Sequence, residues 1–425
     1  MAKHISARRL SAYWRLYLFA LPAAVLVGVF AYFPAASAIY HAFFRWNGSY
    51  VKEFVGLYNF HQLLGWEPFL WVVMALWVTL LAAVLVGRPL WLARGAPWGL
   101  AGLVALVGLA LWAGGFALGL GEAEAWDWYG RTLWATLLGL VVHRLFRAEW
   151  SQWIQGVLGL YGFLWFFYQS MGHTGDQTLW SGFGVIFVLV LANLVKMVPS
   201  IVTAVFIHRL KSDTWQYAYR VLFVVPMIVP AMVGLLVWKS FYDPTQGLLN
   251  RLLDGTGMLD VLVWVDGVFG WDVFLAGTNP SWLGDASLVI PALIFWGFPW
   301  VGTVGVLIYL TGLAGISESV YEAADLDGAS ALEKFLYVEM PLILTQVRIN
   351  LVLMIIGTLQ TYGQILILLG DAGGPRGVAL VPGLYMFRSA FVELYAGKAC
   401  AIGLVLFFFI LLLTEINNRF VRVDK

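Results

Sequence analysis

Charge is scarce in this chain of 425 residues, of which only 12% are Asp, Glu, Lys or Arg. Soluble domains carry about 25% charged and about 45–50% apolar residues, whereas 61% of this sequence is hydrophobic. The net charge of +1 at pH 7 provides no basic field that would attract polyanions. This composition excludes a soluble enzyme, a disordered chain and a nucleic-acid-binding protein.

Cysteine is also nearly absent, and histidine is not clustered. The single cysteine, Cys400, excludes a disulfide framework or a thiolate metal site within one chain. The six histidines are scattered, without the helical pairing that binds zinc. No paired carboxylates and no Ser–His arrangement stand out in the apolar segments. We therefore predict neither catalytic nor metal-binding residues.

Long apolar runs, separated by short charged segments, dominate the sequence. A helix needs about 20 apolar residues to cross a bilayer, where its own backbone must satisfy every peptide group. The pattern predicts an integral membrane protein, an all-α polytopic bundle of about ten spans, with eight as the alternative. The predicted spans are 16–40, 68–88, 98–120, 131–146, 153–171, 181–207, 219–242, 286–312, 346–369 and 399–418.

The loop charges give an orientation. Basic residues precede the first span, and Arg419, Arg422 and Lys425 follow the last, so we expect both termini in the cytoplasm. Ten crossings obey the positive-inside rule at every loop except 370–398. The first apolar run has about 18 residues, longer than the roughly 7–15 of a cleaved signal peptide. An uncleaved membrane anchor is therefore favoured.

Two predicted spans carry polar or aromatic residues suited to a solute path, because polar groups in lipid are costly and mark function. In span 346–369, Gln360 and Gln364 are expected on one helix face, either hydrogen bonding to a solute or joining helices. In span 286–312, Pro299 favours a kink, and Trp300 suits stacking on a sugar ring or simple packing. Lys196, in span 181–207, either pairs with an acidic partner group or reaches toward water.

The segment 317–341 reads as two short helices between spans. Ser317 can cap the first helix, which has Glu318 in its first turn. Gly328 can adopt a positive φ between the helices, and Pro341 is expected to end the second. A plain cytoplasmic hairpin is the alternative to a functional loop.

The residues of this segment resemble the EAA loop of ABC-importer permeases. The matching positions are Glu322-Ala323-Ala324, Asp327-Gly328-Ala329, Phe335 and Pro341. Met340 stands where the family has Leu. Further stretches, including Phe54–Asn59 and Gly373-Gly374-Pro375, resemble the carbohydrate permeases of the maltose and glycerol-phosphate type.

The resemblance implies three regions. Residues 1–66 would hold the cytoplasmic tail, the first core span and an outer segment. Residues 185–425 would form the remainder of a six-span permease core, with 317–341 as its coupling loop. Residues 67–184 have no counterpart and would be about four inserted transmembrane helices, acting as a lateral scaffold, a docking site or lipid-facing padding.

The resemblance also implies partners and roles. A P-loop ATPase would bind ATP and Mg, since this chain has no G-x-x-x-x-G-K-[ST] motif. A second permease and an extracytoplasmic solute-binding protein would complete the importer in a bacterial or archaeal cytoplasmic (inner) membrane. The solute would be a sugar, an oligosaccharide or a related polyol or sugar phosphate. Expected coupling residues are Glu322, Ala323, Ala324, Asp327, Gly328 and Ala329. Expected solute-binding residues are Gly297, Trp300, Gln360, Tyr362, Gly363 and Gln364.

Two other functions stay open at this level. An ion-gradient secondary transporter would need no ATPase partner. A membrane-embedded glycosyl transferase would need catalytic carboxylates facing a cavity, and the predicted spans hold few.

Overall fold

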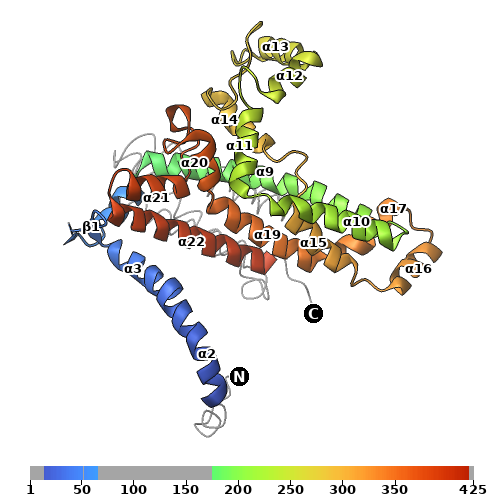
Figure 1. The fold of residues 1–425 in the computed structure, drawn as a ribbon, viewed down its shortest axis with the longest axis horizontal. Coiled ribbons are helices and arrows are strands. Elements are labelled where there is room, and N and C mark those ends of the chain that lie inside the picture. Colours follow the sequence, from blue (N-terminus) through green and yellow to red (C-terminus); the bar gives the residue numbers. More distant parts are fainter. Residues whose placement is uncertain (1–13, 51, 66–174, 421–425) are drawn as a thin grey trace, which may run out of the picture. The chain divides into compact units, whose positions relative to one another are not determined.

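The computed structural model describes residues 14–50, 52–65 and 175–420, which are mostly helical (Figure 1). The chain divides into two compact units, residues 1–59 with 186–425 and residues 60–185. The predicted spans 68–88, 98–120, 131–146 and 153–171 lie outside the described residues. The proposed insertion at 67–184 therefore stays a prediction.

The N-terminal segment consists of a long helix followed by a small β-hairpin. Its elements are α2 (Trp14–Val27), a π-helical turn (Gly28–Tyr32), α3 (Phe33–His41), β1 (Phe44–Trp46), β2 (Lys52–Phe54) and α4 (Tyr58–Leu64). The strands are antiparallel, with Phe44 opposite Phe54. The buried Asn59 amide fixes the hairpin by donating to the carbonyl oxygens of Ala42 (2.8 Å) and Phe44 (3.0 Å).

The rest of the described chain is a series of helices, several of them short. In chain order they are α9 (Gln177–His208), α10 (Asp213–Val224), a 3₁₀ turn (Val225–Ile228), α11 (Ala231–Phe241), α12 (Leu248–Gly255), α13 (Met258–Phe269), α14 (Ala286–Phe295), α15 (Thr303–Leu313), α16 (Glu318–Leu326), α17 (Ala331–Glu333), a π-helical segment (Lys334–Glu339), α18 (Met340–Leu342), α19 (Leu344–Leu359), α20 (Gly363–Leu369), a 3₁₀ turn (Pro375–Gly377), α21 (Pro382–Phe391) and α22 (Ala396–Phe420).

Helix α22 lies against strand β1, and the contact requires a glycine. A Cβ atom on Gly397 would lie 1.9 Å from the carbonyl oxygen of Phe44. Only a residue without a side chain allows the two backbones to approach this closely.

Two of the described helical segments, Leu18–His41 and Gln177–His208, are each long and apolar enough to cross a membrane. Three sharply bent helix pairs raise this number to five if each pair is one span. The bends are 86° between α10 and α11, 75° between α15 and α16, and 71° between α18 and α19. The total of ten spans stays a prediction.

Two predicted spans are interrupted rather than continuous. Helix α14 ends before Gly297 (φ +80°) and Trp300 (φ +61°), which lie outside the right-handed helical region. Helix α19 ends at Leu359, and α20 begins only at Gly363. The expectation that Gln360 and Gln364 share one helix face is therefore wrong, because the helix stops between them. Irregular backbone at membrane depth is tolerated where protein or a water-filled cavity surrounds it.

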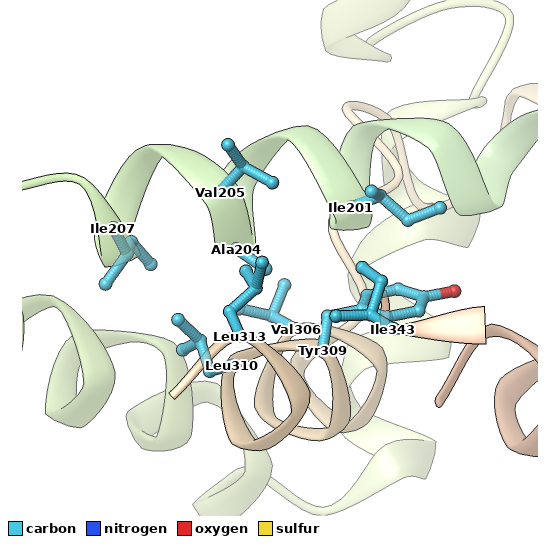
Figure 2. Packing of buried hydrophobic residues seen from close by; sticks show 9 residues of the cluster. All are labelled: Ile201, Ala204, Val205, Ile207, Val306, Tyr309, Leu310, Leu313 and Ile343. Carbon is cyan, nitrogen blue, oxygen red and sulfur yellow. The ribbon is translucent and has the colours of Figure 1, made fainter. Parts of the chain in front are cut away.

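The core of the larger unit lies between α9 and α15 (Figure 2). Its buried side chains are Ile201, Ala204, Val205 and Ile207 from α9, Val306, Tyr309, Leu310 and Leu313 from α15, and Ile343 from the bend before α19. Phe335 and Met340, from the 317–341 segment, pack against this cluster. The segment is thus attached to the helix core on its inner side.

Candidate functional site

The first half of the 317–341 segment is a helix closed by a glycine. Gly328 has φ +74°, which confirms the predicted positive φ. Its N–H donates to the carbonyl oxygen of Asp325 (3.1 Å), and the N–H of Ala329 donates to that of Ala324 (2.9 Å). These two bonds form a Schellman motif, in which glycine is the favoured residue.

Both helix starts in the segment have serine at the N-cap position. Ser317 precedes α16 as predicted, but its side chain makes no capping bond. Ser330 forms a capping box with Glu333, which the sequence analysis missed although the S-x-x-E pattern signals it. Pro341 does not end the second helix, which continues to Leu342 and bends at Ile343.

The segment has an exposed outer side and a buried inner side. Of the predicted coupling residues, Ala324 is buried, Ala329 is half-buried and the others are exposed, namely Glu322, Ala323, Asp327 and Gly328. Large apolar side chains also stand on the outer side, with Leu326 90%, Tyr337 76% and Leu332 65% exposed. The outer side therefore offers apolar and acidic groups to a partner.

An ion pair between the buried Glu339 and the partly exposed Arg209 fixes the inner side to the end of α9. Arg209 donates from Nε to Oε1 of Glu339 (3.1 Å) and from Nη2 to Oε2 (2.8 Å), while the Glu339 carboxylate is fully buried. The same Nη2 donates to the carbonyl oxygen of Ala331 (3.0 Å). Breaking such a pair from one side costs about 3–5 kcal/mol, because a buried charge remains unpaired.

Tyr321 extends this network. Its hydroxyl donates to Oε1 of Glu339 (3.4 Å) and lies 3.3 Å from Nε2 of His208. Burial raises the pKa of Tyr321 to about 12, and the Glu339 carboxylate adds to the rise. The hydroxyl therefore stays protonated at neutral pH and remains a donor. Sequence reasoning missed this network, because Arg209 and Glu339 are 130 residues apart and no local motif joins them.

Helix α9 also contacts both interrupted helices. Asn193 donates from Nδ2 to Oγ1 of Thr358, just before the break at Gln360 (2.9 Å). Lys196 places its ammonium 6.0 Å from the centroid of the Trp300 ring. Asn193 and Lys196 are one helical turn apart, so one face of α9 reaches both breaks.

Ser200, one further turn along this face, completes the contact with the first break. Its hydroxyl accepts the N–H of Gly302 (2.9 Å) and donates to the carbonyl oxygen of Trp300 (3.4 Å). Thr303 donates from Oγ1 to the carbonyl oxygen of Phe223 (2.7 Å). Side chains thus satisfy backbone groups that the helix interruption would leave open.

The predicted solute-binding residues lie at these two breaks. Gly297 and Trp300 belong to the first, and the second holds Gln360, Tyr362, Gly363 and Gln364. Gln360 and Tyr362 are exposed, and the Tyr362 ring stacks on Phe387 at 5.8 Å. The contact between Trp300 and Lys196 was not predicted.

Lys196 is half-buried and lies well inside α9, not at its end. His208 lies 12 positions further on, about 18 Å along the helix axis and beyond the length of a lysine side chain. A lysine at the centre of a span costs about 2.5–3.5 kcal/mol, and a cation–π contact returns about 0.5–2 kcal/mol. The Trp300 ring therefore offsets only part of the cost.

Comparison with known proteins gives relatives for part of the chain. No family model matches the sequence. The diacetylchitobiose uptake system permease protein NgcF of Streptomyces coelicolor is 30% identical over 191 residues, which are 44% of this chain and 48% of that protein. The probable ABC transporter permease protein YurN of Bacillus subtilis is 29% identical over 50% of this chain and 66% of its own length. The sulfoquinovosyl glycerol transport system permease protein SmoG of Agrobacterium fabrum is 25% identical over 49% of this chain and 60% of that protein.

These matches are partial, since the chain spans about half the length of NgcF and less than two thirds of SmoG. Among solved structures, a bacterial ABC transporter involved in the import of the acidic polysaccharide alginate is similar at 15% identity and a TM-score of 0.49. That similarity covers 98% of this chain and 99% of the other. We draw the family relationship from the sequence relatives alone. They agree with the resemblance stated from the sequence: over about half of its length the chain is similar to ABC transporter permease proteins, two of which are named for diacetylchitobiose uptake and for sulfoquinovosyl glycerol transport.

Proposed function

We propose that this chain is the transmembrane permease subunit of an ATP-driven importer for a sugar, an oligosaccharide or a related polyol or sugar phosphate. One observation carries the proposal. The 317–341 segment exposes one side to a partner and is tied on the other side, through Arg209 and Glu339, to the end of α9. The same helix reaches both helix breaks at Asn193 and Lys196.

The energy would come from a separate subunit. The sequence lacks a phosphate-binding loop, so a partner ATPase would bind ATP and Mg and dock on the exposed side of the segment. A second permease and an extracytoplasmic solute-binding protein would complete the complex. The chain itself would perform no chemical reaction.

ATP-dependent closure of the ATPase subunits would displace the coupling segment. The Arg209–Glu339 pair and the packing of Phe335 and Met340 would transmit this displacement to α9 and α15. The breaks would then absorb the change in backbone angles and shift the pore between inward-facing and outward-facing states.

The solute class rests on the relatives and on the side chains at the breaks. The printed names of two relatives specify diacetylchitobiose and sulfoquinovosyl glycerol, which supports a carbohydrate. Trp300 would stack on a sugar ring, and Gln360, Tyr362 and Gln364 would hydrogen bond to hydroxyl groups. Gly297 and Gly363 would allow the close approach of solute and backbone.

The membrane arrangement belongs to the same proposal. The chain would lie in the cytoplasmic membrane with both termini and the 317–341 segment inside. Ten spans would result from a six-span core and about four inserted helices at 67–184.

Affinity purification of the chain in mild detergent from its native host tests this function. We expect a P-loop ATPase and a second permease to copurify, and uptake into liposomes with the solute-binding protein to require ATP. Uptake by the chain alone, driven by an ion gradient without ATP, would instead establish the secondary transporter. A sugar-transferring activity of the purified chain that is lost on replacing its acidic residues would establish the transferase.

A further inference from the structure

We propose that Lys196 and Trp300 form a subsite that recognises an anionic group on the transported solute, such as a carboxylate, sulfonate or phosphate on a sugar. The inference rests on the proposed importer function and narrows its solute class. It assigns a role to the one charged side chain of helix α9, which the coupling mechanism does not use.

The first support is the absence of a counter-charge in the surrounding helices. Residues 177–208, 286–313 and 344–369 contain no Asp or Glu. Within the described parts of the chain, Lys196 forms no ion pair, and its charge meets only the face of the Trp300 ring. The cation–π contact offsets only part of the free-energy cost of a lysine charge within a span. An anion close to the ammonium would lower the remaining cost.

The second support is a pair of unused hydrogen-bond donors at the same break. The indole N–H groups of Trp296 and Trp300 are buried, and neither has a hydrogen-bond partner among the residues that the structure describes. An indole nitrogen can only donate, so it suits an oxygen-rich ligand. Oxygens of an anionic sugar would satisfy donors that the protein leaves open.

The arrangement also fits a sugar ring next to its charged group. Trp300 presents an aromatic face, and Lys196 sits over it on the α9 side. Helix α15 begins at Thr303, so its positive end lies three residues after Trp300 in the chain. A neutral sugar would use the ring alone, whereas a uronic acid or a sugar phosphate would also use the lysine.

The test is uptake by the complete complex, reconstituted in proteoliposomes with its ATPase, second permease and solute-binding protein. The probe is a defined mixture of neutral oligosaccharides, sugar uronates, sugar sulfonates and sugar phosphates, and mass spectrometry identifies what enters with ATP. Lys196→Met removes the charge at similar length, and Lys196→Arg keeps it. Lys239→Met is the matched control, because Lys239 lies in another membrane helix, where it donates to the carbonyl oxygen of Ile367.

We expect the wild type to import an anionic member of the mixture, Lys196→Met to import it at least tenfold more slowly, and Lys196→Arg and Lys239→Met to import it nearly normally. Import of neutral members alone, or equal import of an anionic one by Lys196→Met, overturns the subsite and leaves the importer function standing. Loss of the second permease from the Lys196→Met complex also overturns it, because the lysine would then pair across the subunit interface. Uptake by the wild-type complex without ATP would overturn the importer function itself.

Discussion

The 317–341 segment and the 243–285 segment differ in what holds them in place, although each contains two short helices. Figure 1 shows α16 and α17 far from α12 and α13. The first segment is joined to a distant part of the chain by Arg209–Glu339 and by core packing. The second is held by bonds within itself.

Asn250 organises the 243–285 segment. Its buried amide donates to the carbonyl oxygens of Pro244 and Pro280 (3.1 Å each) and accepts the indole N–H of Trp282 (2.7 Å). Asp266, also buried, accepts the backbone N–H groups of its own following loop. Local bonds hold the 243–285 segment together, whereas the bonds of 317–341 tie it to Arg209 at the end of α9.

Of the substitutions that test the two segments, Gly328→Glu in 317–341 should have the largest effect on transport. Gly328→Glu places a charged side chain on the exposed side and forces a non-glycine residue to φ +74°, at about 1–2 kcal/mol. There is open space around the Cβ position, so the chain should still fold and assemble. We expect transport to be abolished in an uptake assay, with Gly328→Asn, which tolerates this φ, as the matched control. Wild-type uptake by Gly328→Glu would refute the coupling role.

Breaking the Arg209–Glu339 ion pair should have the second largest effect. Arg209→Met leaves the Glu339 carboxylate buried and unpaired, which should cost about 3–5 kcal/mol of stability. We expect a lower unfolding temperature and uncoupled ATP hydrolysis, with exposed Lys211→Met as the control. The double variant Arg209→Met/Glu339→Met should regain stability, because two apolar groups pack in place of the ions. If it also regained full transport, packing rather than the ion pair would carry the coupling.

Removing the Asn250 amide should affect the 243–285 segment and leave 317–341 unchanged. Asn250→Ala leaves the Trp282 indole N–H and the Pro280 carbonyl oxygen without partners, at about 1–3 kcal/mol for each buried group. Amide hydrogen exchange should become faster over 243–285 and stay unchanged over 317–341. Arg251→Ala, at the exposed neighbouring residue, serves as the control. Faster exchange in both segments would contradict their independence.

The Ser330 capping box should have the smallest effect. Hydrogen bonds from Ser330 lower the pKa of Glu333, so the box stabilises the segment above the usual pKa of glutamate and is lost as pH falls through the lowered pKa. Ser330→Ala should increase hydrogen exchange at α17 at every pH, because it removes the hydroxyl that accepts the Glu333 N–H. Glu333→Gln, which resembles the protonated acid, should increase it only above the lowered pKa of Glu333, because the carboxylate that accepts the Ser330 backbone N–H is charged only there. Ser319→Ala, within α16, is a matched control. An equal effect of Glu333→Gln above and below that pKa would exclude the carboxylate bond as its cause.

Local features of the 317–341 segment could be read from the sequence, and long-range contacts could not. The positive φ of Gly328 follows from a glycine after a helix-forming run, and the S-x-x-E pattern of Ser330 was available but was not used. The partner of Arg209 lies 130 residues away, so only folding reveals it. Pro299 indicated a kink, but a full interruption depends on Ser200, whose hydroxyl satisfies the backbone there. The four-residue spacing of Gln360 and Gln364 suggested one helix face, but α19 ends at Leu359, α20 begins at Gly363, and no sequence signal next to Gln360 marks the end of α19.

The separation between Arg209 and Glu339 has a consequence for biogenesis. At about 5–20 residues per second, the ribosome reaches Glu339 roughly 7–26 s after Arg209. Until then Arg209 lacks this partner, and basic residues in short loops favour the cytoplasmic side during membrane insertion. Arg209 would thus have two roles. It would first be a topology signal on the nascent chain and later, once Glu339 has been synthesised, the partner of Glu339 in the folded protein.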